Sequence, residues 1–154
     1  MSFDFARTPL AGEPVEDEAA EDLVVKIHRC ALAGLCYGDA RSWDLGQRLL
    51  ANAVPAADVG PLFGQFYAFG RALIAAAERP LSCRPLPYAG HCAEEALVLS
   101  MLEMAQRGSP AAVIGAAGAL VGVGDLGTVF IATQALARGL ARCGLFVRSP
   151  ITRR

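Results

Sequence analysis

The residue types that could do chemistry gather in one stretch, residues 79–95, with the sequence RPLSCRPLPYAGHCAEE. It holds three of the nine prolines, two of the five cysteines, one of the two histidines and a pair of adjacent glutamates. Apolar segments flank it on both sides. This stretch is therefore the first place where a binding or catalytic site is expected.

A metal site is one chemistry that these residues allow. His91 and Glu94 are three residues apart, so a helix would present both on one face. The other histidine, His28, lies on the apolar side of an earlier helical segment, two turns after Glu21. Helical bundles bind metals with histidines and carboxylates from facing helices. We therefore keep His28, Glu21, His91 and Glu94 as candidate metal ligands, although the Glu-x-x-His order of such sites is absent and no cofactor is predicted outright.

A reactive thiol is the second possibility. We expect Cys92 in the first turn of a helix, where free backbone N–H groups stabilise a thiolate. Arg84 could add positive charge. Against this, the glutamates that follow disfavour a thiolate, and the neighbouring His91 points about 100° away around the helix. A thiol-dependent enzyme using Cys92 is therefore an alternative to a binding function.

Two motif matches lack the context that their chemistry needs. GVGDLG, residues 122–127, has the spacing of a dinucleotide loop, but no strand–helix–strand pattern precedes it and only 27 residues follow. CAEEAL, which begins at Cys92, resembles half of the cytidine-deaminase zinc motif, yet the Pro-Cys-x-x-Cys half is missing. We expect close helix packing in the first case and no deaminase in the second.

The hydrophobic pattern predicts an all-α, single-domain bundle of five or six helices. The first expected helix spans residues 16–37, and the second runs from a cap at Asp39 or Ser42 to about residue 53. The third begins near Pro55 and includes the apolar stretch 61–78, the fourth spans about 91–107 and the fifth 111–123. The sixth runs from Asp125 or Thr128 to about residue 143. Pro80, Pro85 and Pro87 rule out a continuous helix in the proline-rich loop, residues 79–90. Residues 1–15 are predicted to be a flexible segment, residues 16–146 the helical domain, and residues 147–154 a C-terminal tail. In the first helix, Lys26 and Arg29 are placed on the face opposite the apolar one.

Composition bounds the possible functions. The chain has 154 residues, of which 54% are hydrophobic and only 19% charged, against about 25% charged in an ordinary domain. Excess apolar surface is typical of an oligomer interface. A net charge of −1 gives no basis for binding nucleic acid. The longest uncharged apolar run, residues 110–124, is shorter than the ~18 residues that a membrane span needs.

The sequence thus predicts a non-catalytic helical interaction or regulatory protein that binds itself or another protein. An odd number of cysteines without a preceding signal peptide indicates a cytoplasmic protein with reduced thiols. The alternative is a metal- or small-molecule-binding bundle. Its pocket would form at the start of the fourth helix. The candidate pocket residues are Arg84, Tyr88, His91, Cys92, Glu94 and His28.

Overall fold

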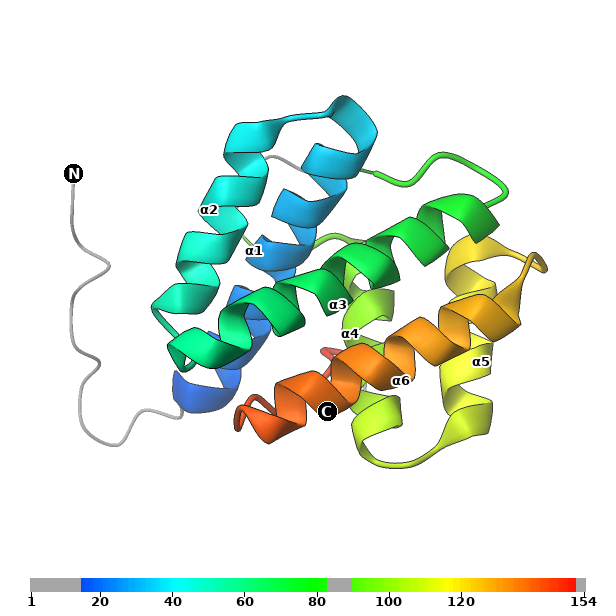
Figure 1. Ribbon diagram of the computed structural model, residues 1–154. Helices are drawn as coiled ribbons and strands as arrows, with labels where there is room; N and C mark the ends of the chain where they lie inside the picture. The colour runs from blue at the N-terminus through cyan, green and yellow to red at the C-terminus, as the bar shows by residue number, and fades with distance from the viewer. Residues whose placement is uncertain (1–14, 83–89, 152–154) are drawn as a thin grey trace.

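The fold is that of a computed structural model, which describes residues 15–82 and 90–151. These residues form six helices and no strand, so the predicted all-α bundle is confirmed for the described part of the chain (Figure 1). The helices are α1 (Val15–Tyr37), α2 (Ala40–Ala51), α3 (Ala56–Ala76), α4 (Ala93–Gln106), α5 (Pro110–Val121) and α6 (Leu126–Arg142).

Polar caps and glycines set the helix ends. Asp39 caps α2 by accepting a hydrogen bond from the Arg41 N–H at 3.1 Å, and Asp125 caps α6 in the same way through Thr128 at 3.1 Å. Gly38 follows α1 with φ of 65°, a conformation that glycine adopts without strain. These boundaries lie within two or three residues of the predicted ones, because the capping residues are visible in the sequence.

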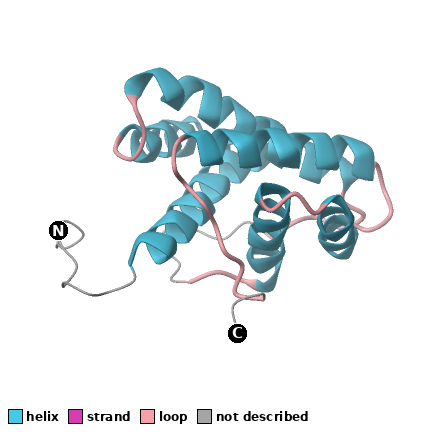
Figure 2. Ribbon diagram, turned by 90° about the horizontal axis from the view of Figure 1, so that it is seen from below, coloured by secondary structure: helices cyan, strands magenta, loops and turns pink. Residues whose placement is uncertain are grey.

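The core forms around α3, which packs against α1 on one side and α6 on the other (Figure 1). Its side chains Phe66, Phe69 and Leu73 are fully buried. α4 contacts α5 and α6, and it also contacts α1. Figure 2 shows the described elements as helices joined by loops, with no strand among them. The aromatic stretch of the sequence is therefore the central helix, as its apolar residues on several faces predict.

The glycine-rich match at residues 122–127 is the turn that joins α5 to α6. Gly122 has φ of 95°, and Glu78, just after α3, accepts a hydrogen bond from the Val123 N–H at 3.0 Å. A Cβ atom at Gly124 would come within 2.6 Å of the Ala76 carbonyl oxygen. Gly122 and Gly124 therefore let this turn pack on the end of α3. This differs from the close packing between helices expected for the match, because Gly122 lies just after the last residue of α5.

Residues 145–149 have no regular secondary structure, but they are part of the packed domain. Val147 is 3% exposed and Ser149 is fully buried. The packed chain thus extends at least three residues beyond position 146, the predicted end of the helical domain.

No single helix in residues 15–82 and 90–151 has both the length and the hydropathy to cross a membrane. α5 and α6 meet that test only as a pair, and they are bent by 118° where they join.

The contact between α1 and α2 gives a test of the packing. Trp43 packs edge-on against Phe63 and Tyr67, with ring centroids 6.0 and 5.1 Å apart, and its indole lies against Gly34. A Cβ atom at Gly34 would overlap that indole. We expect Gly34→Ala to destabilise the protein by about 1–3 kcal/mol in urea unfolding, because a held ring must move.

Gly64→Ala is the matched control for this substitution. Gly64 is also within a helix, but a Cβ atom there meets nothing within 4 Å. It should stabilise the protein by about 0.5–1 kcal/mol. Equal stability of the two variants would show that Trp43 does not pack on Gly34.

Candidate functional site

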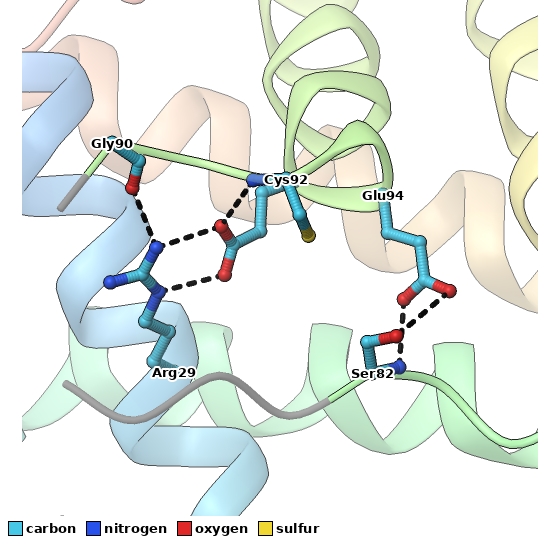
Figure 3. Close-up of polar contacts among 6 residues, drawn as sticks. Arg29, Ser82, Gly90, Cys92 and Glu94 are labelled. Carbon is cyan, nitrogen blue, oxygen red and sulfur yellow. Dashed lines mark hydrogen bonds and ion pairs between the residues drawn. The ribbon is translucent and has the colours of Figure 1, made fainter. Parts of the chain in front are cut away.

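A buried ion pair joins α1 to the start of α4. The Arg29 side chain is 3% exposed and that of Glu95 is 5% exposed. Arg29 Nε donates to Glu95 Oε2 at 2.8 Å and Nη2 donates to Oε1 at 2.9 Å, a two-pronged contact (Figure 3). The prediction that Arg29 lies on the solvent face is wrong. α1 packs against α2, α3 and α4, so it is covered on more sides than an amphipathic helix at a bundle surface.

The same two side chains hold the backbone that leads into α4. Arg29 Nη2 also donates to the Gly90 carbonyl at 2.6 Å. Glu95 Oε1 accepts a hydrogen bond from the Cys92 N–H at 3.0 Å, as a glutamate three residues after an N-cap often does. Because Cys92 has extended backbone dihedrals, α4 begins at Ala93, two residues later than predicted. The pair therefore fixes the point at which the chain enters α4.

The electrostatics of the pair favour both charges. Burial alone would raise the pKa of Glu95, but hydrogen bonds from Arg29 and the Cys92 N–H, together with the positive charge of Arg29, hold that pKa below its usual value. The hydrogen bond to Glu95 raises the pKa of Arg29. The Glu95 carboxylate therefore stays ionised at neutral pH. Its charge is balanced by Arg29 of the same chain and not by a bound ligand.

His28, next to Arg29 in α1, is buried without its full set of partners. Its ring lies 5.8 Å from that of Phe69, and its Nδ1 atom has no hydrogen-bond partner among the described residues. Burial lowers its pKa to about 4; Glu95 opposes this shift and Arg29 adds to it. The imidazole is therefore neutral near pH 7.

A small cavity lies beside His28. It is lined by His28, Ser82, Glu94 and Glu95 and by the apolar side chains of Leu32, Leu73, Leu81, Val98 and Leu120. Glu94 borders it by accepting hydrogen bonds from Ser82, at 2.8 Å from the backbone N–H and 3.5 Å from the hydroxyl (Figure 3). Its volume is about 10 Å³, which is close to what one water molecule requires, whereas small-molecule pockets usually measure about 300 Å³ or more.

The structure brings together only some of the predicted pocket residues. His28 and Glu94 line the same cavity, whereas Cys92 is the N-cap residue of α4 and does not line it. His91 is exposed. Arg84 and Tyr88 lie outside the described residues.

The predicted metal site is not formed. Glu21 accepts a hydrogen bond from the Arg148 N–H at 2.6 Å, at the C-terminal segment instead of at His91. In residues 15–82 and 90–151, no three His, Cys, Asp or Glu side chains are arranged to hold a metal ion. His28 and Glu21 are two turns apart on α1, and tertiary contacts direct them to different neighbours.

The thiols are separated in the same way. Cys30 is buried, and burial raises its pKa to about 11. Cys36 is exposed, while Cys92 and Cys143 are half-buried. Cys92 is the N-cap residue of α4, and its backbone N–H donates to Glu95 Oε1 at 3.0 Å.

Sequence reasoning missed Arg29 and gave Glu95 only a minor place. A signal was available for both. Arg29 is the one basic residue in an otherwise uncharged run from Ile27 to Gly38, and Glu95 lies at the capping-box position of α4. The pairing itself requires the two helices to meet.

Comparison with models of known families, with curated proteins and with solved structures finds no match.

The buried pair has a measurable energetic consequence. Arg29→Met leaves the Glu95 carboxylate buried without its cation, so we expect a loss of about 3–5 kcal/mol in the free energy of unfolding. The double variant Arg29→Met/Glu95→Gln removes both charges and keeps an acceptor for the Cys92 N–H. It should be more stable than Arg29→Met alone, as urea unfolding followed by circular dichroism would show.

Lys26→Met serves as the control on the same helix. Lys26 pairs with Asp22 at 2.9 Å, and both side chains are largely exposed, so its loss should cost under about 1 kcal/mol. If Arg29→Met costs no more than Lys26→Met, the pair is not buried as described.

His28 predicts a pH dependence of stability. Its pKa is about 4 in the folded chain, against the ordinary histidine value of 6.5 in the unfolded chain, so between these values the unfolded chain binds more protons. The stabilisation that neutral His28 contributes to the folded state is complete above pH 6.5 and is lost as the pH falls towards 4. We expect the wild type to lose roughly 2–3 kcal/mol from this group between pH 7 and 4.5.

His28→Leu should abolish this loss, while His91→Gln, at an exposed histidine, should retain it. Glu95 affects stability in a lower pH range. Because its pKa in the folded chain is lowered from 4.5, its contribution to the stability of the folded state is lost only below about pH 4.5. Unfolding free energies measured from pH 7 to 4.5 would therefore isolate His28, and an unchanged slope in His28→Leu would refute its role.

Proposed function

We propose that this chain is a non-catalytic helical interaction protein that self-associates through α5. The observation that carries the proposal is that α5, PAAVIGAAGALV, has no polar side chain on any face. Val113, Ala117 and Val121 point into the core, but the other side is open to solvent. We call that side the α5 face. It comprises Ala111, Ile114, Gly115 and Ala119.

A helix that is apolar all round is normally covered all round. α5 is covered by α4 and α6 only on its inner side, and Figure 1 shows it at the edge of the molecule. Ile114 is 37% exposed, and Val123, directly after the helix, is 87% exposed. A partner that covered this face would remove apolar surface from water.

A second copy is the partner that these residues favour. In a two-fold interface the same patch meets itself, so a charged patch would place like charges together. Residues 109–124 carry no charge. Gly115 also presents little side-chain bulk, as do Ala111 and Ala119 one helical turn before and after it. Small side chains let two helices approach closely.

The rest of the molecule supports a non-catalytic role. The polar groups at the start of α4 are engaged in holding α1, Gly90 and Ser82. The cavity beside His28 has the size of one water molecule. Neither the metal-binding nor the thiol alternative has a comparable observation in its favour.

Ile114→Glu tests the proposal. It would place a buried charge at the centre of the interface, so the association constant should fall at least tenfold. Light scattering and sedimentation over a concentration series would measure it. Tyr37→Glu is the control, because Tyr37 is 72% exposed and lies at the C-terminal end of a different helix, α1.

Two results would contradict the proposal. One is a wild type that stays monomeric at every concentration. The other is an Ile114→Glu variant that associates as strongly as Tyr37→Glu.

A further inference from the structure

His28 lies on α1 beside the start of α4, and one of its ring nitrogens has no hydrogen bond. The side chain is 3% exposed, and its Nδ1 atom lacks a partner among the described residues. The ring lines the small cavity of about 10 Å³ together with Glu94 and Ser82. That volume leaves room for about one water molecule or for a small movement of a neighbouring side chain. His28 is thus a buried base that accepts a proton only by placing a charge in this site.

Charged groups face the His28 ring from two helices. Arg29 follows it in α1, and Glu94 and Glu95 belong to the first turn of α4. The other residues that line the cavity are uncharged. They are Ser82 and apolar side chains, namely Leu32 of α1, Leu73 of α3, Leu81 after α3, Val98 of α4 and Leu120 of α5. A proton on His28 would therefore place a second cation beside Arg29.

Glu95 cannot neutralise that second cation without releasing its present partners. Its Oε2 atom accepts from Arg29 Nε at 2.8 Å, and its Oε1 atom accepts from Arg29 Nη2 at 2.9 Å and from the Cys92 N–H at 3.0 Å.

Glu94 is held by weaker donors. Both belong to Ser82, the backbone N–H at 2.8 Å and the hydroxyl at 3.5 Å, and both are neutral (Figure 3). An imidazolium would bring a full positive charge to the hydrogen bond, which strengthens it. A protonated His28 therefore competes with Ser82 for the Glu94 carboxylate.

The chain at Ser82 can move without the rest of this region. Glu78 anchors the residues just after α3, because its carboxylate accepts from the Val123 N–H at 3.0 Å and its own N–H donates to the Val121 carbonyl at 3.0 Å. Beyond that anchor, Leu81 is half-buried and Ser82 is exposed. The buried ion pair joins α1 to α4 without using Ser82. Movement at Ser82 would thus uncover the cavity and leave both helices in place.

We propose that His28, Glu94 and Ser82 form an acid-sensitive latch at the start of α4. When His28 takes up a proton from water, the Glu94 carboxylate turns from Ser82 to the imidazolium. The hydrogen bond from the Ser82 N–H is lost, and the apolar lining of the cavity is exposed as Leu81 and Ser82 leave it. The buried ion pair is unchanged. The latch is separate from the α5 face and does not depend on self-association.

Hydrogen exchange of the Ser82 N–H, followed by NMR on the full chain, tests the latch. The pKa of His28 is about 4 in the closed form and returns to at least the ordinary 6.5 once the ring meets water and a carboxylate. Linkage then makes opening roughly twentyfold more frequent at about pH 5 than at about pH 7. After correction for the intrinsic exchange rate, the protection of Ser82 should fall by about that factor.

The Val123 N–H is the matched control within the chain. It also donates to an exposed glutamate, Glu78 Oε2, at 3.0 Å, but it does not line the cavity. Its protection should stay constant over the same pH range.

Two variants identify the groups that act. His28→Gln removes the titrating ring and should keep the protection of Ser82 constant. Glu94→Gln retains an acceptor for the Ser82 N–H without the charge, and it should reduce the change to a few-fold at most. Because Glu94 is half-buried at the rim of the cavity, this second variant keeps the test available if His28→Gln does not fold.

Three results would overturn the latch. One is an equal change at Ser82 and Val123, which would show that the glutamates themselves titrate. Another is a change at Ser82 that persists in full in His28→Gln or Glu94→Gln. The third is a simultaneous loss of protection at Ser82 and at Phe66 and Phe69 of α3, because protonation would then unfold the whole bundle instead of opening one contact.

Discussion

A guanidinium and a carboxylate buried together constrain the rest of this structure. Neither Arg29 nor Glu95 can be left alone away from water, so α1 and the start of α4 must meet at one register. The hydrogen bonds to Gly90 and from Cys92 extend this constraint to the backbone entering α4. Helices that are far apart in the sequence are thereby joined at one point, where the chain between α3 and α4 returns to the bundle.

The same constraint explains why the stretch that is richest in reactive residue types is a structural joint. Glu95 is committed to Arg29, and Glu94 is committed to Ser82. His28 lies beneath them as a neutral, buried ring. The cavity that remains holds no more than about one water molecule. What the described part of this region contributes is a fixed connection between α1 and the start of α4.

Two further buried carboxylates, those of Glu21 and Glu103, lie towards the other end of α4. They accept hydrogen bonds from the backbone N–H groups of Arg148 and Ser149, near the C-terminus. In both places an acid is stabilised inside the protein by donors from a distant part of the chain. The donors differ: Glu95 is bound by a side chain on a helix, whereas Glu21 and Glu103 are bound by the backbone N–H groups of Arg148 and Ser149. The α5 face is the surface on which self-association is proposed.

Much of the fold follows from local sequence alone. The helices and their ends were predictable because apolar spacing, the caps Asp39 and Asp125, and the prolines after Arg79 act within a few residues. The central place of α3 follows from its aromatic residues on several faces. The absence of polar side chains in α5 was equally visible.

Tertiary structure alone decided how the polar residues are used. Periodicity placed Arg29 on the solvent face, because a single helix does not reveal that three others cover it. His28 and Glu21 share a helix, yet His28 lines the cavity and Glu21 binds the backbone N–H of Arg148. Local spacing specifies which side of a helix a residue occupies, but the partner of a buried charge is a contact across 66 or 127 residues of chain. Such contacts exist only once the helices have packed, and that is why the function of these charges could not be found in the order of residues.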